Sequence, residues 1–260
     1  MSGFSAAWLA LREPADAAAR SAALASFAMS GLETAALRIL DLGGGTGANI
    51  RYLSPRLRSP QHWTLVDNDP ALLERAPAFA ETHSADLNTV VNDNTLFEGC
   101  RLVTASALLD LVSLSWLAKL VLRCRAANAA VLFALSYDGR IVCSPEEPED
   151  EDVRQLVNAH QKTDKGFGPA LGPDAAARVG ALLADEGYTT RQERTDWKLT
   201  ADMRVLQREL VIGWAGAASK MAPDRMESVE DWRSRRMAHI AAGRSRIVVG
   251  HIDVAGVVNR

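Results

Sequence analysis

A run of glycines directly after a short apolar segment constrains the fold of this chain more than any other feature. Residues 38–42 read Arg-Ile-Leu-Asp-Leu, and Gly43-Gly44-Gly45-Thr46-Gly47 follows at once. An apolar run that ends in glycines predicts a buried strand, a tight turn and the start of a helix. Glycine also allows positive φ angles and a close approach of a ligand to the backbone. We therefore expect a strand–turn–helix unit over residues 38–57.

The same alternation continues along the chain. Apolar segments at 62–66, 79–85, 102–105 and 129–136 predict further strands, and helices are expected between them, including one over 108–125. Strands that alternate with helices favour a doubly wound, mostly parallel sheet with helices on both faces. The sequence therefore predicts an α/β fold.

The remaining segments predict helices, connections and two late strands. Two alanine-rich helices are expected at 5–12 and 15–29, separated at Pro14. Residues 144–173 are acidic, then rich in glycine and proline, which is typical of a surface stretch and a loop that is either a lid or a plain connection. We also expect helices at 174–186, at 202–220 and from Ser228, with strands at 188–199 and 246–254.

Composition narrows the classes of function. The formal net charge of −3 in 260 residues gives no general attraction to nucleic acid or to an anionic membrane. The three cysteines form no CxxC pair, so neither a disulfide framework nor a zinc site is expected, and no metal is predicted. No uncharged apolar run approaches the roughly 20 residues of a membrane helix. We expect a cytoplasmic protein.

Two carboxylates follow the second and third predicted strands. Asp67 lies where a carboxylate accepts both hydroxyl protons of a ribose, and such bonds contribute on the order of 1.5–3 kcal/mol each. The alternative, that Asp67 caps the next helix, is weakened because Asp69 suits that position. Asp86 is placed to accept from an adenine amino group.

The order strand–DxGxGxG–helix–strand–Asp–helix–strand–Asp, over residues 38–143, resembles the class I (Rossmann-like) S-adenosylmethionine-dependent methyltransferase family. The motifs that carry the resemblance are ILDLGGGTGANIRYL (39–53), WTLVDNDPALLERA (63–76) and LVTASALLDLVS (102–113). The chain departs from the family at Cys100-Arg101, where members often have Phe-Asp. The glycine spacing does not fit G-x-G-x-x-G, which argues against a nicotinamide dehydrogenase.

The resemblance implies a seven-stranded sheet with an antiparallel last strand, plus helical cap elements at both ends of the chain. It divides the chain into an N-terminal helical cap (1–37), a core (38–200 and 244–260) and a helical insertion over the substrate side (201–243). It also implies S-adenosylmethionine as the cofactor. The expected cofactor-binding residues are Asp41, Gly43, Gly44, Gly45, Gly47, Asp67, Asn68, Asp86, Leu87 and Ser106.

Three residues are candidates for a general base, which is needed where the acceptor must lose a proton. Asp110 is expected to open the helix after the fourth strand, where a carboxylate is also favoured by the helix dipole. Tyr137 follows the fifth strand in Tyr137-Asp138-Gly139-Arg140, which reads equally well as an ordinary turn. His160 lies in the 144–173 segment and has a surface role as its alternative.

The function expected from these residues is methyl transfer to an oxygen or nitrogen of a small molecule. A tRNA or protein methyltransferase and a non-catalytic S-adenosylmethionine-binding protein are the alternatives. A cluster of arginines could meet an RNA backbone, but a solvated helix face balanced by Glu227, Glu230 and Asp231 is favoured. The arginines of this cluster are Arg233, Arg235, Arg236, Arg244 and Arg246.

Overall fold

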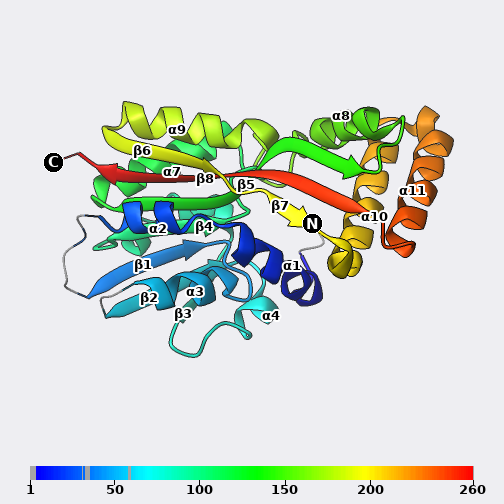
Figure 1. Cartoon of the computed structure of the whole chain (residues 1–260). Coiled ribbons are helices and arrows are strands. Elements are labelled where there is room, and N and C mark those ends of the chain that lie inside the picture. The colour runs from blue at the N-terminus through cyan, green and yellow to red at the C-terminus, as the bar shows by residue number, and fades with distance from the viewer. Residues whose placement is uncertain (1–3, 31, 33–35, 58–59, 260) are drawn as a thin grey trace.

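The computed structural model describes residues 4–30, 32, 36–57 and 60–259. The described residues form one mixed sheet in the order β3-β2-β1-β4-β5-β8-β6 (Figure 1). The first five strands pair in parallel, whereas β8 runs antiparallel to both of its neighbours, β5 and β6. The strands are β1 (Leu37–Leu42), β2 (Gln61–Asp67), β3 (Glu81–Ser84), β4 (Leu102–Ser106), β5 (Ala130–Ser144), β6 (Tyr188–Arg194), β7 (Trp197–Leu199) and β8 (Arg246–Val258). The predicted doubly wound sheet with an antiparallel last strand is confirmed, with short β7 as an additional strand on β8.

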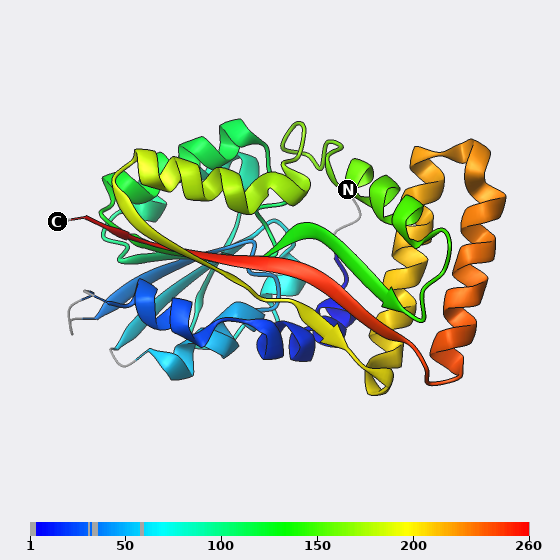
Figure 2. The ribbon, with the colours of Figure 1, turned by 45° about the horizontal axis from the view of Figure 1, so that its top comes forward.

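Helices cover both faces of the sheet. In Figures 1 and 2, α7 (Leu114–Ala126) and α9 (Ala175–Asp185) lie on one face, and α2 (Ala22–Ala28) and α3 (Ala48–Leu53) lie on the other. Each face buries its own apolar cluster, as parallel strands require. Short helices complete the connections: α4 (Pro70–Leu73), α5 (Leu87–Val90) and α6 (Asn94–Phe97).

Strands β5 and β8 continue beyond the carboxyl ends of the parallel strands as an antiparallel ribbon (Figure 2). Three helices pack on this ribbon around a separate apolar cluster: α8 (Asp150–Gln161), α10 (Arg204–Met221) and α11 (Met226–Ala241). We call them the helical cap. The apolar side of α10 serves this packing, with Leu206 and Trp214 buried. Helix α1 (Ala6–Ala19) lies at the carboxyl ends of the strands, between the sheet and the cap (Figure 1).

Several predicted boundaries are wrong. Pro14 does not separate two helices, because α1 runs through it; the exposed proline leaves only the carbonyl of Ala10 without its helical N–H partner. The helix predicted from residue 108 begins at Leu114, where Ser113 caps it. The segment at 137–140 is not a turn but part of β5, which accommodates Gly139 at φ +88° in a register shift.

The acidic stretch and the last helix also differ from expectation. Residues 150–161 form α8 rather than a loop, with three acidic residues in its first turn, where the helix dipole favours them. Helix α11 begins at Met226, before the predicted start at Ser228. Among the described residues, no helix is long and apolar enough to cross a membrane.

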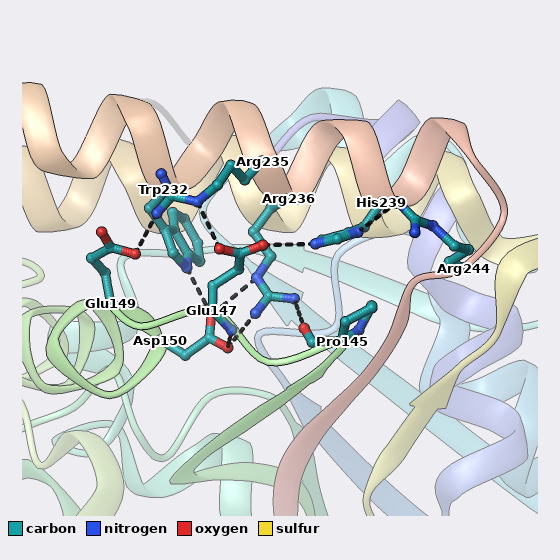
Figure 3. Close-up of polar contacts among 9 residues, drawn as sticks. All are labelled: Pro145, Glu147, Glu149, Asp150, Trp232, Arg235, Arg236, His239 and Arg244. Atoms are coloured by element: carbon teal, nitrogen blue, oxygen red, sulfur yellow. Dashed lines mark hydrogen bonds and ion pairs between the residues drawn. The ribbon is translucent and has the colours of Figure 1, made fainter.

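Helix α11 is fastened to the start of α8 by ion pairs (Figure 3). The guanidinium of Arg236 is fully buried, and it donates to the carboxylate of Asp150 and to the carbonyl of Pro145. Asp150 also accepts a hydrogen bond of 2.7 Å from the indole of Trp232. Arg235 pairs with Glu147 and Glu149. Of the acids that were expected to balance the arginines, only Glu230 does so, by pairing with Arg233. The rest of the prediction is wrong, because the packing of the cap brings residues 145–150 against α11.

We predict that Asp150→Ala lowers the free energy of unfolding by about 3–5 kcal/mol, because it leaves the charge of Arg236 buried without its partner. Urea denaturation followed by circular dichroism measures this loss. The matched change Glu230→Ala removes the exposed partner of Arg233 and should cost much less, because water screens this pair. Equal losses for the two variants would contradict the importance of the buried pair.

Candidate functional site at the carboxyl edge of the sheet

The glycine turn adopts the conformation that its sequence requires. Gly43, Gly45 and Gly47 have φ angles of +64°, +53° and +79°, which side chains disfavour. Gly44 is required for space, since a Cβ there would lie 1.8 Å from Leu65 Cδ1. The N–H of Gly43 donates to the carbonyl of Val66 at 2.8 Å. The turn is thus held against the end of β2.

Asp67 joins this turn to the loop that follows β2. Its buried carboxylate accepts the N–H of Gly45 at 2.8 Å through Oδ2 and the N–H of Asp69 at 3.0 Å through Oδ1. Each carboxylate oxygen has a further lone pair for another donor. The capping position of α4 is taken by Asp69, whose side chain accepts from the N–H of Ala71. Asp67 therefore does not cap α4, which was the alternative to a role in binding a ligand.

Asp41 ends a buried polar chain that runs from the end of α1 to the sheet. Asn49 on α3 donates to Asp41 Oδ1 at 2.6 Å and to the hydroxyl of Thr104 at 3.1 Å. The amide oxygen of Asn49 accepts from Arg20, at the end of α1. Asp41 Oδ2 has no hydrogen-bond partner among the described residues. Complete burial raises the pKa of Asp41 to about 7, although the hydrogen bond from Asn49 opposes the shift.

Helix α1 packs directly on the glycine turn. A Cβ at Gly45 would lie 2.9 Å from Leu9 Cδ1. Further along, α1 and α3 border a shallow pocket whose lining includes Arg20, Asn49 and Ser106. The N-terminal helix therefore forms a wall of the site and brings an arginine to it.

The residues expected around an adenine follow β2 and β3. Asn68 is exposed, and so is Asp86, whose carboxylate accepts the N–H of Asn88 and caps α5. Leu87 is buried, and its Cδ1 lies 3.5 Å from the position of a Cβ at Gly43. Asp86 thus performs the common capping role, and Leu87 lines the turn.

The polar loop that precedes α9 is held against this edge of the sheet. The side chain of Asn88 donates to the carbonyl of Gly166 at 2.7 Å. The N–H of Leu171 donates to Val112, and that of Gly172 donates to Asp110, both at 2.9 Å. The loop therefore docks on the connections after β3 and β4.

Of the three candidate bases, Asp110 and Tyr137 lie together. Asp110 is buried in the loop before α7, not in the helix, and its carboxylate lies near the backbone of Tyr137. Burial raises the pKa of Asp110 to about 6. The phenol of Tyr137 donates to Asn158 on α8 at 2.7 Å, and burial raises the pKa of this phenol.

His160 has different surroundings. It lies half-buried in the last turn of α8. Burial, together with the charges of Lys165 and Lys220, lowers the pKa of its imidazole. The imidazole of His160 thus lies near one lysine of the cap and one lysine of the loop that follows α8.

Sequence reasoning missed several buried polar residues at this edge. His251 and Asp253 interrupt the apolar strand β8 and are 5% and 1% exposed. Asp253 accepts the N–H of Leu135, at a register shift in β5, and the hydroxyl of Thr195. Polar residues within an apolar strand were the available signal, because such residues are seldom buried without a partner or a role.

Comparison with known proteins adds evidence on the fold. No protein-family model matches the sequence, and no curated protein matches it. The YcgJ protein from Bacillus subtilis has a TM-score of 0.51 at 12% identity, over 91% of this chain and 98% of that chain. The cyclopropane synthase MmaA2 from Mycobacterium tuberculosis has a TM-score of 0.50 at 13% identity, over 97% and 94%. A SAM-dependent methyltransferase from Thiobacillus denitrificans, in complex with S-adenosyl-L-homocysteine, has a TM-score of 0.47 at 14% identity, over 98% and 99%. Many of the similar structures are SAM-dependent methyltransferases. The similarity to the YcgJ protein and to the cyclopropane synthase shows that this chain shares their fold.

The buried carboxyl of Asp41 generates a prediction about pH. Because its pKa is raised in the folded state, the folded protein binds more protons than the unfolded chain between the ordinary value of 3.8 and about 7. The free energy of unfolding therefore falls as the pH rises through this window. Asp41→Asn should remove this contribution, so that the variant gains up to about 4 kcal/mol relative to the wild type between pH 4 and pH 7.5. Urea denaturation at both pH values measures the gain, and parallel pH profiles would contradict it.

Proposed function

We propose that this chain catalyses methyl transfer from S-adenosylmethionine to an oxygen or nitrogen of a small-molecule acceptor. The observation that carries the proposal is the bond from the N–H of Gly45 to Asp67, which places a glycine turn beside a buried carboxylate. This juxtaposition lies at the carboxyl edge of the sheet, where open α/β folds bind their ligands.

The residues present fit an adenosyl cofactor. The free lone pairs of Asp67 suit the two hydroxyls of a ribose, and the glycines of the turn would allow backbone contact with the cofactor once Leu9 is displaced from Gly45. The unpartnered Oδ2 of Asp41 suits an ammonium group, with Gly44 beside it. Asn68, Asp86 and Leu87 would border the adenine, and Ser106 the reactive end.

S-adenosylmethionine supplies a methyl group on a positively charged sulfur, so the donor carries its own activation. The protein then has to align the acceptor, and well-oriented reactants gain up to roughly 7–11 kcal/mol. Asp110 is the base that we favour. Burial raises its pKa to about 6, and this value suits proton uptake near neutral pH. In this assignment Tyr137 lies beside Asp110, and Tyr137 and His160 remain the other candidate bases.

Two features support a small acceptor over a polymer. Helix α1 and the helical cap enclose the carboxyl edge, in keeping with the proposed division into N-terminal cap, core and helical insertion (Figure 2). Arg235 and Arg236 are occupied by acids of the 147–150 segment, so they are not free for a nucleic-acid backbone. Helix α8 belongs to the cap by its packing and extends the insertion assigned to 201–243. We place the enzyme in the cytoplasm, without nucleic acid or membrane as its partner.

Two alternatives give different results. A tRNA methyltransferase would show salt-dependent RNA binding that Arg235→Ala and Arg236→Ala abolish. A non-catalytic binding protein would bind S-adenosylmethionine, yet no acceptor in a metabolite extract would be methylated. The proposed enzyme should methylate an extract component and release S-adenosylhomocysteine.

Calorimetric titration tests the cofactor assignment. We expect S-adenosylhomocysteine to bind with micromolar affinity and NAD not to bind. Asp67→Ala should weaken S-adenosylhomocysteine at least tenfold, or about 1.4 kcal/mol, because the ribose hydroxyls lose their acceptor. The control Asp69→Ala removes a nearby carboxylate that caps α4 and should change the affinity less than threefold. Equal effects of the two substitutions, or preferred binding of NAD, would refute the assignment.

A further inference from the structure

Several polar groups near the carboxyl edge are buried without a hydrogen-bond partner among the residues that the structure describes, and three of them, besides Asp41 Oδ2, come from the loop after β4, from β8 and from α1. They are Oδ1 of Asp110, Nδ1 of His251 and the indole N–H of Trp8. Asp110 is 7% exposed and His251 is 5% exposed. Buried polar groups are almost always paired, so an unpaired set calls for an explanation.

These groups belong to one neighbourhood. The carboxylate of Asp110 lies near the backbone of Tyr137, and Tyr137 lies directly opposite His251 in the β5–β8 pairing. The rings of Tyr137 and His251 are 6.5 Å apart in an edge-to-face arrangement. The ring of His251 also lies near the ring of Trp197 on β7, with the two ring centroids 4.9 Å apart.

Helix α1 closes this neighbourhood. Arg12 lies over the ring of Trp197, with its Cζ 4.9 Å from the ring centroid, and the indole of Trp197 donates to Asp16 at 3.1 Å. Both oxygens of Asp16 accept from Arg12, so this arginine already has its counter-charge. Trp8 is one turn before Arg12 on the same face of α1, and it packs in the same apolar cluster as Tyr137 and Trp197.

We propose that Asp110, His251 and Trp8 form the acceptor-binding site, and that the acceptor is a small amine that also carries a hydroxyl or carbonyl oxygen. This inference rests on the proposed methyl transfer and specifies nitrogen as the acceptor atom. Asp110 Oδ1 and a neutral His251 Nδ1 accept the N–H groups of the ligand, whereas the N–H of Trp8 donates to its oxygen. The aromatic rings of Tyr137 and Trp197 add attraction for an ammonium group.

The charges at this site select against an acidic ligand. Asp110 has no cationic partner in direct contact among the described residues, whereas Arg12 is paired with Asp16. A carboxylate or phosphate placed against Asp110 would therefore meet a buried negative charge. An ammonium group would instead neutralise it, which is the pairing that buried charges require.

The proton has a defined destination in this arrangement. The bound ammonium gives one proton to Asp110, and this frees the nitrogen lone pair. A carbon–nitrogen bond then forms as the carbon–sulfur bond of the donor breaks, and the electron pair of the broken bond stays on sulfur. The methylated nitrogen carries the positive charge away, and Asp110 returns its proton to solvent after the product leaves.

Three matched probes test the inference by calorimetry on the full chain saturated with S-adenosylhomocysteine. They are 2-amino-1-phenylethanol, 1-phenyl-1,2-ethanediol and mandelate, which differ only in carrying an ammonium, a hydroxyl or a carboxylate. We expect the amine to bind at least tenfold more tightly than the diol, and mandelate not to bind. Asp110→Asn should reduce the affinity of the amine to that of the diol.

The control Asp174→Asn removes a carboxylate that is 53% exposed and paired with Lys162, and it should leave the affinity for the amine unchanged. Unchanged binding of S-adenosylhomocysteine by Asp110→Asn shows that this variant is folded. Equal affinities for the three probes, preference for mandelate, or full retention of amine binding in Asp110→Asn would overturn the inference. Failure of the wild type to bind S-adenosylhomocysteine would refute the proposed function instead, and the amine titration without it would still measure the role of Asp110.

Discussion

The bond between the backbone N–H of Gly45 and the carboxylate of Asp67 ties together the ends of the first two strands, and the rest of the site is arranged around it. The bond requires a turn in which Gly43, Gly45 and Gly47 have positive φ, and it requires a carboxylate that leaves the sheet at the same level. Parallel pairing of β1 with β2 supplies that level, since Leu42 lies opposite Val66. A side chain in the turn or a shift in register would separate the two groups.

The sequence predicted this central part well because its determinants are local. Glycine spacing, apolar runs and an aspartate after each strand are read within about ten residues, and they placed Asp41, Asp67 and the sheet correctly. The helical cap was harder to predict, because α8 is acidic and has a low intrinsic preference for a buried position. Its placement depends on Arg236 and Trp232, which lie more than 80 residues away. Likewise, the continuation of β5 through Gly139 depends on pairing with β8, and no local sequence pattern indicates this pairing.

Non-local packing also determines which polar residues meet. Trp8, Asp110 and His251 come from α1, the loop after β4 and the middle of β8, so their proximity is a property of the topology alone. The strand β8 connects the two halves of the molecule, since its first part supports the cap and its last part completes the sheet. His251 lies on β8 between these two parts, and its ring contacts Tyr137 and Trp197 at the proposed acceptor site. In the proposed function, the parallel strands bind the cofactor, and the antiparallel ribbon and α1 recognise the acceptor.

The central claim is that the glycine turn and Asp67 form one adenosyl-binding site under α1. A crystal structure of the chain with S-adenosylhomocysteine tests it most directly. The account predicts ribose hydroxyls within hydrogen-bonding distance of Asp67, the amino-acid end beside Asp41, and Leu9 displaced from its contact with Gly45. Electron density for the ligand elsewhere on the molecule, or a ribose that does not contact Asp67, would contradict it.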